Sequence, residues 1–139
     1  MKTIYTFVIS IAVLGILDFI WLGLISAKTY KQLLSPIGKM GPTGSFEPRL
    51  FAMICVYIAI ALSFVIFVLP QIKNLGLVDA FIYGAVFGIL VYAIYEFTNY
   101  SILKDWPKKL VIIDTLWGGV LYGLSSVVVP YILKLLRIW

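Results

Sequence analysis

Four long runs of apolar residues divide this sequence, and they restrict its fold more than any other feature. The runs are 4–25, 50–69, 80–102 and 110–133. A helix needs about 20 consecutive apolar residues to cross the hydrocarbon core of a bilayer, and each run reaches that length. Inside a bilayer the backbone must satisfy its own polar groups, which favours helices. We therefore predict an all-α fold, a four-helix transmembrane bundle forming one integral membrane domain over residues 1–139.

The composition agrees with a bilayer partner and excludes several kinds of site. Hydrophobic residues make up 63% of the chain and charged residues only 12%, against roughly 25% charged in soluble domains. The chain has no histidine, which excludes a histidine-based metal site or general base. Its one cysteine, Cys55, cannot form an internal disulfide. We expect no cofactor and no metal. We also expect no nucleic-acid partner, because attraction to anionic lipid headgroups accounts for the positive charge of the chain.

The start of the chain has some features of a signal peptide, since Lys2 precedes an apolar stretch and small residues follow near Ala27. However, the run 4–25 is longer than the usual apolar region of about 7–15 residues. It also carries Asp18 and Trp21, which a removed leader would not need. We expect this segment to be retained as the first transmembrane helix.

The first loop is the only long one, and its two halves differ. The stretch 27–34 is predicted as a short interfacial helix, whereas 36–48 is rich in glycine and proline and should be irregular. The apolar side chains of the short helix are expected to face lipid: Tyr30, Leu33 and Leu34.

The third loop, 103–109, is short enough for a hairpin, so the third and fourth helices should be antiparallel neighbours. Asp79 and Asp105 precede these helices and are predicted N-caps. Pairs of small residues at a spacing of four should let the two backbones approach closely. These are Gly84, Gly88, Gly119 and Gly123.

Orientation follows from the lysines and arginines near the helix ends. Loops one and three share a side and carry seven of them, and the opposite side carries four. Because cytoplasmic loops hold the excess of positive residues, loops one and three are predicted to be cytoplasmic and both termini to be outside.

Three acidic residues lie within the apolar runs, namely Asp18, Glu96 and Asp114. A carboxylate at the bilayer centre costs about 2.5–3.5 kcal/mol on insertion scales, which makes such acids functional candidates by default. Each lies within about two turns of loop one or loop three, so all three fall in the same half of the membrane. Asp18 and Asp114 each precede a tryptophan by three residues. The first pair leads into loop one and the second leads away from loop three, so the two pairs have opposite directions in the membrane and we do not interpret them as an internal repeat.

These acids lead to a predicted substrate-binding pocket that opens toward loops one and three. Its floor comprises Asp18, Glu96, Asn99 and Asp114, and its aromatic walls are Trp21, Tyr92, Tyr95 and Trp117. Arg49 is a candidate counter-ion or gate.

A structural interpretation of the same residues is also open. Asn99 and Tyr100 would then cap the third helix, and Asp114 would pair with Lys108 or Lys109 at the interface. Trp106 and Trp139 would belong to an aromatic belt.

Four motifs resemble a known family. They are LDFIWLG at 17–23, YAIYEFTNY at 92–100, KDWP at 104–107 and DTLWG at 114–118. Their order and spacing resemble small bacterial membrane proteins classed as domain of unknown function 2177, where the acid of the third helix is usually aspartate in place of Glu96. The resemblance covers nearly the whole chain and implies an integral protein of the bacterial cytoplasmic membrane. It implies no activity.

Three classes of function remain open. The leading hypothesis is a transporter or channel for a small cationic or protonatable solute, since acids exchange protons and aromatic faces favour cations. A homodimer would help to enclose the path. The alternatives are an intramembrane enzyme acting on a lipid or apolar substrate, and a non-catalytic membrane subunit or ligand-binding module. The chain has no nucleophile motif, which argues against the enzyme.

Overall fold

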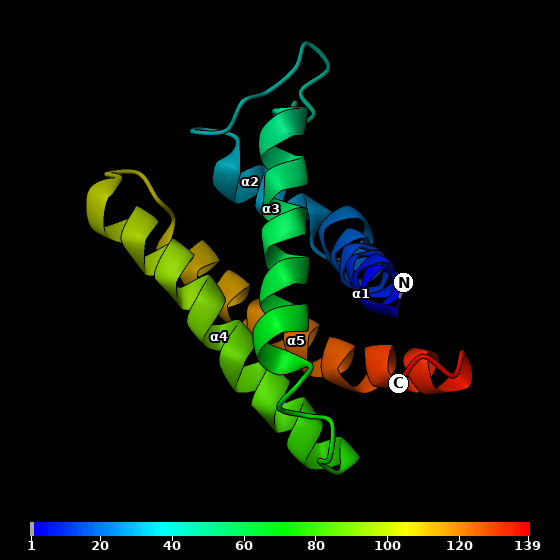
Figure 1. The fold of residues 1–139 in the computed structure, drawn as a ribbon. Helices are drawn as coiled ribbons and strands as arrows, with labels where there is room; N and C mark the ends of the chain where they lie inside the picture. Colours follow the sequence, from blue (N-terminus) through cyan, green and yellow to red (C-terminus); the bar gives the residue numbers. More distant parts are fainter. Residues whose placement is uncertain (1) are drawn as a thin grey trace.

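The computed structural model describes residues 2–139, and the elements of this part of the chain are helical (Figure 1). In chain order they are α1 (Lys2–Phe19), the π-helical segment η1 (Ile20–Ile25), α2 (Ala27–Leu34), α3 (Leu50–Ser63), the π-helical segment η2 (Phe64–Val68), α4 (Leu77–Ile102) and α5 (Lys108–Leu135). The all-α prediction is confirmed. The segment between α2 and α3 is irregular, as expected from its glycines and prolines, and contains an isolated bridge between Met40 and Phe46.

Four segments of the described chain are long and apolar enough to cross a membrane: α1 with η1, α3 with η2, α4 and α5. They correspond to the four predicted runs. The third and fourth helices begin earlier than expected, at Leu77 and Lys108, because residues that precede the apolar runs, among them Asp79 and Lys109, are also helical. The short helix predicted at 27–34 is present as α2.

The predicted N-caps were wrong. Gly76 and Pro107 occupy the N-cap positions of α4 and α5, and each has an extended backbone that turns into the helix. Asp79 lies within the first turn of α4 instead, where a carboxylate is favourable beside the positive end of the helix dipole. Asp105 lies before the proline that begins α5 and caps neither helix.

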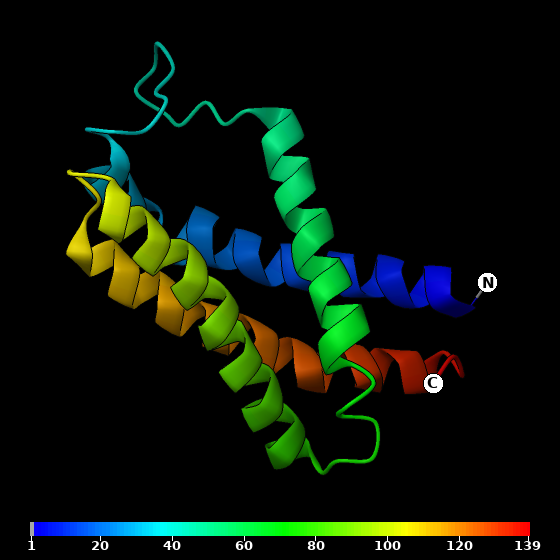
Figure 2. The same cartoon turned by 60° about the vertical axis from the view of Figure 1, so that its left-hand side comes forward.

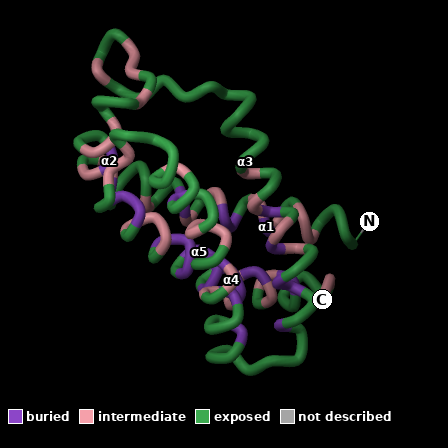
Figure 3. The backbone as a smooth tube through the Cα atoms, turned by 90° about the vertical axis from the view of Figure 1, so that its left-hand side faces the viewer, coloured by how far each residue is buried: buried purple, intermediate pink, exposed green. Residues whose placement is uncertain are grey.

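Helix α5 is the central element of the bundle. Of its most apolar stretch, 56% is buried, against 17% for each of the other three spans, and Figure 3 shows the buried positions following its length. Helices α1 and α4 both pack on α5. Helix α3 crosses the others at a steep angle and contacts α1, while η2 reaches both α1 and α4 (Figure 2).

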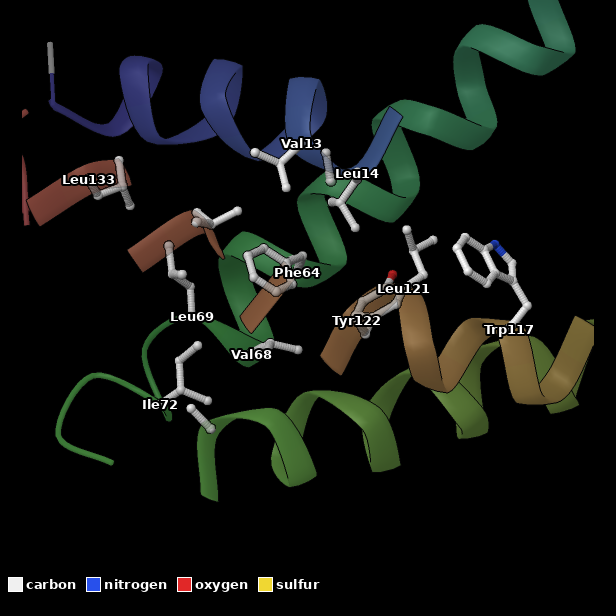
Figure 4. Packing of buried hydrophobic residues seen from close by; sticks show 13 residues of the cluster. Val13, Leu14, Phe64, Val68, Leu69, Ile72, Trp117, Leu121, Tyr122 and Leu133 are labelled. Carbon is white, nitrogen blue, oxygen red and sulfur yellow. The ribbon is translucent and has the colours of Figure 1, made fainter. Parts of the chain in front are cut away.

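The buried core lies where η2 meets α1 and α5 (Figure 4). Phe64 and Tyr122 are fully buried there and make an edge contact with ring centroids 6.0 Å apart. The Tyr122 hydroxyl lies 2.5 Å from Ser63 Oγ and donates to the Ile60 carbonyl oxygen at 3.2 Å. These bonds tie α5 to α3 at the turn where α3 becomes η2.

An even number of spans puts both ends of the chain on one side of the membrane, and in Figures 1 and 2 the two ends lie at the same end of the molecule. Reporter fusions at Lys2 and Trp139 should therefore report the same compartment, and the excess of lysine and arginine in loops one and three predicts that it is the outside. Opposite compartments, or removal of the N-terminal segment, would contradict a four-span topology.

Candidate functional site

Asp18 lies in the last turn of α1 and is held by two other helices. Its side chain is buried, with 6% of the residue exposed. Trp117 Nε1 of α5 donates to Asp18 Oδ1 at 2.8 Å, and the Tyr57 hydroxyl of α3 donates to Oδ2 at 2.7 Å. Both carboxylate oxygens therefore have partners, as burial in an apolar environment requires. Both partners are neutral.

The next residue of the site is placed by η1. This π-helical turn carries Trp21, and Ser26 closes it by donating from both its backbone N and its Oγ to the Trp21 carbonyl oxygen at 2.7 Å. The Trp21 ring stacks on Trp117, with centroids 4.5 Å apart and planes at 6°. The two Asp-x-x-Trp pairs of the sequence thus meet across the α1–α5 interface. Each contributes one ring to the stack.

The short helix α2 completes the arrangement through Tyr30. Trp21 Nε1 donates to the Tyr30 hydroxyl at 3.2 Å, and that hydroxyl donates to Asp114 Oδ1 of α5. Tyr30 was predicted to face lipid, and this was wrong because its residue is only 8% exposed. A carboxylate within a span needs a donor, and Tyr30 supplies one. Helix α2 consequently covers the side on which the predicted pocket was to open.

We call these six residues the tryptophan–aspartate network. They are Asp18, Trp21, Tyr30, Tyr57, Asp114 and Trp117. Tyr92, predicted as an aromatic wall, belongs to α4 and packs with its ring against Gly118, beside the network. Sequence reasoning missed Tyr57. Its signal was present, because Tyr57 and Ser63 are the only hydroxyl groups of an otherwise apolar run.

Three predicted residues, Tyr95, Glu96 and Asn99, do not join the network. Together with Trp106, which was assigned to the aromatic belt, they form a second group, the hairpin cluster. Glu96 is fully buried, and its Oε2 accepts from Trp106 Nε1 at 2.8 Å. Tyr95 is largely exposed and meets the edge of Trp106, with centroids 6.0 Å apart. The residues that were expected to line a single pocket therefore lie in two separate groups. Glu96 lies on α4 near the hairpin that joins it to α5, whereas Asp18 lies on α1.

Residues 3–131 match the family described as predicted membrane protein, DUF2177. The chain belongs to this family. No curated protein and no solved structure matches it. The matched range contains all residues of the tryptophan–aspartate network and of the hairpin cluster, and the four motifs at 17–23, 92–100, 104–107 and 114–118 also lie within it.

The tryptophan–aspartate network of this DUF2177 protein lacks a positive partner. Among residues 2–139 the ion pair is Lys39–Glu47, at 3.1 Å in the first loop. Asp114 bonds to Tyr30 and pairs with neither Lys108 nor Lys109, so that interpretation was wrong.

Two further side-chain roles follow from the same part of the chain. Arg49, the candidate counter-ion or gate, is exposed at the start of α3 and makes no ion pair there. Within the described residues no three acidic or cysteine side chains come together as metal ligands. What the arrangement offers chemically is two carboxylates in one half of the membrane, aromatic faces beside them, and hydroxyl groups that donate to both.

Proposed function

We propose that this DUF2177 protein transports or conducts a small cationic or protonatable solute across the bacterial cytoplasmic membrane. The observation that supports this proposal is the tryptophan–aspartate network. Asp18 and Asp114 lie in transmembrane segments and are bonded only to neutral donors. Because an uncompensated charge is costly in an apolar environment, the two carboxylates favour a state in which a proton or a cationic solute supplies the missing positive charge.

The aromatic residues suit the same solute. Trp21 and Trp117 stack closely beside both carboxylates, and indole faces are the best side-chain partners of a cation. Tyr92 adds a further ring from α4.

A solute reaching Asp114 from the loop side must displace the Tyr30 hydroxyl, so we propose α2 as the element that opens. Arg49, at the start of α3 on that side, stays our candidate gate. The proposal includes a homodimer, because α3 buries little of its surface and leaves one wall of the bundle thin. Mass determination of the protein in nanodiscs checks that part of the proposal.

The test is flux into liposomes that contain the purified protein. We expect wild-type protein to pass protons or methylammonium under an imposed potassium diffusion potential, followed with an internal pH dye. Asp18→Asn and Asp114→Asn should each reduce the flux at least about tenfold, because losing the charge removes more than the ~1.4 kcal/mol that a tenfold change represents. Asp79→Asn is the matched control, since Asp79 is exposed in α4 and lies outside the network.

Two results would contradict transport. One is a wild-type flux equal to that of empty liposomes for protons, sodium, potassium and methylammonium. The other is an equal loss in Asp79→Asn and Asp18→Asn. Turnover of a membrane lipid that depends on Asp18 and Asp114, in place of flux, would establish the intramembrane enzyme instead.

A further inference from the structure

The hairpin cluster contains two buried polar atoms with no hydrogen-bond partner among the described residues. They are Glu96 Oε1 and Asn99 Nδ2. Glu96 is 0% exposed, and its only bond is the one from Trp106 to its other oxygen. Buried polar atoms in proteins are nearly always bonded, because an unpaired one loses its interaction with water and gains nothing. One atom is an acceptor and the other a donor on the same helix face, and in this structure they do not bond to each other, so each is free to bond to a ligand group.

The two atoms define what that ligand must carry. Glu96 and Asn99 are three residues apart on α4 and so share one face, with their side chains about 5–6 Å apart at Cβ. The carboxylate oxygen requires a donor, and the amide nitrogen requires an acceptor. A primary ammonium group with an oxygen two carbons away meets both requirements over this short span. A quaternary ammonium would not, since it has no N–H to donate.

A groove of about 470 Å³ lies beside Trp106 of the cluster, and neither Glu96 nor Asn99 lines it. It lies between the first loop and the α4–α5 hairpin, and Trp106 belongs to both features, since it lines the groove and donates to Glu96. Leu34, Ile37 and Phe46 form apolar walls, while Lys104 and Asp105 bring opposite charges to the lining. Among the residues of the hairpin cluster, Trp106 is the one that lines this groove.

The depth of the cluster matches the edge of a bilayer. Glu96 lies six residues before the end of α4 at Ile102, which is about 9 Å along the helix axis. If a hydrocarbon core of about 30 Å is centred on this 26-residue helix, Glu96 lies a few ångströms inside the hydrocarbon, next to the headgroup region. The amine of a headgroup can approach Glu96 here while its phosphate stays beside Lys104.

We propose that Glu96 and Asn99 bind a 2-aminoethanol group, which enters from the groove when Trp106 moves away from Glu96. The ammonium donates to Glu96 Oε1, and the oxygen accepts from Asn99 Nδ2. This chemistry has two sources, a free amino alcohol and the headgroup of an aminophospholipid. The site is separate from the tryptophan–aspartate network. Its test measures ligand binding, so the result does not depend on whether the protein transports a solute.

Tryptophan fluorescence of the purified protein in detergent tests this site without any measurement of flux. We expect ethanolamine to produce a saturable change that is absent in Trp106→Phe, which assigns the signal to Trp106. Glu96→Gln should weaken the apparent affinity at least about tenfold, because it removes a charged hydrogen bond. Glu47→Gln, in the exposed loop acid, should behave as wild type. Tetramethylammonium should produce no change.

Nanodiscs distinguish the two sources. If the ligand is a headgroup, discs that contain phosphatidylethanolamine should show the shifted fluorescence without added ethanolamine, and discs of phosphatidylcholine alone should not. If the ligand is free, both discs should respond equally to ethanolamine. Should Glu96→Gln fail to purify as a folded protein, Asn99→Leu carries the same expectation. The absence of a saturable change in wild-type protein in detergent and in both discs would overturn the proposal, as would a wild-type response in the variant.

Discussion

Gly88→Leu is expected to prevent the native packing of α4 against α5 and to cause a large loss of stability. A Cβ added to Gly88 would overlap the Gly118 carbonyl oxygen and press on the Cβ of Tyr122. The first of these is backbone and cannot rotate away. Overpacking a well-packed interior costs about 1–3 kcal/mol even when side chains can adjust, so we expect a loss of about 3 kcal/mol or more.

The measurement is the free energy of unfolding in mixed detergent and denaturing surfactant, followed by helical content. Gly15→Leu is the matched control, because a Cβ at Gly15 meets nothing within 4 Å. It changes the same residue type within another span and should leave the stability close to that of wild type. Equal stability of the two variants would mean that α4 and α5 are not in close contact in the membrane.

Trp117→Ala is the second substitution with a large expected effect. The residue is buried, stacks on Trp21 and donates to Asp18, so truncation removes packing and leaves one carboxylate oxygen without its donor. Replacing a large buried aromatic residue with alanine costs about 3–5 kcal/mol. We expect a loss in this range, together with the loss of any flux that depends on Asp18.

A graded series separates the two contributions of Trp117. Trp117→Phe keeps an aromatic ring against Trp21 but removes the N–H, so it should cost only the hydrogen bond to a charged group, about 1.5–3 kcal/mol. Tyr131→Ala makes an aromatic truncation on the same helix at a residue that is 69% exposed, and it should be nearly neutral. An equal loss in Trp117→Ala and Tyr131→Ala would contradict the assigned role of the α1–α5 interface.

Much of the helical bundle can be predicted from the sequence. Hydropathy averaged over about 20 residues locates a span, and that sum is insensitive to what the helix packs against. The α4–α5 interface was also predictable, because glycines at a spacing of four have few uses in a span other than close backbone approach. The short helix α2 lies at the residues predicted for an interfacial helix, 27–34.

The helix starts were less predictable. Asp79 and Asp105 have the right chemistry for an N-cap, but Gly76 and Pro107 already supply the backbone turn. The N-cap is the last residue with an extended backbone before the helix. Its position depends on how the preceding loop packs against neighbouring residues. A sequence pattern cannot show this.

The candidate site divides along the same line. The acids within the spans, and their shared half of the membrane, follow from position along each run and the known helical rise. The partners of those acids do not. Tyr30 was expected to face lipid and Tyr57 was overlooked. A tyrosine has an apolar ring that can contact lipid and a hydroxyl that can donate to a buried carboxylate, so its residue type does not show which contact it makes. Only the crossing of α2 and α3 over α1 and α5 decides which of these each tyrosine does.

Sequence alone therefore determined that this chain has four helices long and apolar enough to cross a membrane, and it predicts that three acids share one half of that membrane. Tertiary structure decided that Asp18 and Asp114 belong to one network while Glu96 belongs to the hairpin cluster. The physical reason is the range of each interaction. Burial of apolar surface adds up along a single helix, whereas a hydrogen bond needs its two atoms within about 3 Å, and helices distant in the chain meet that condition only after they pack.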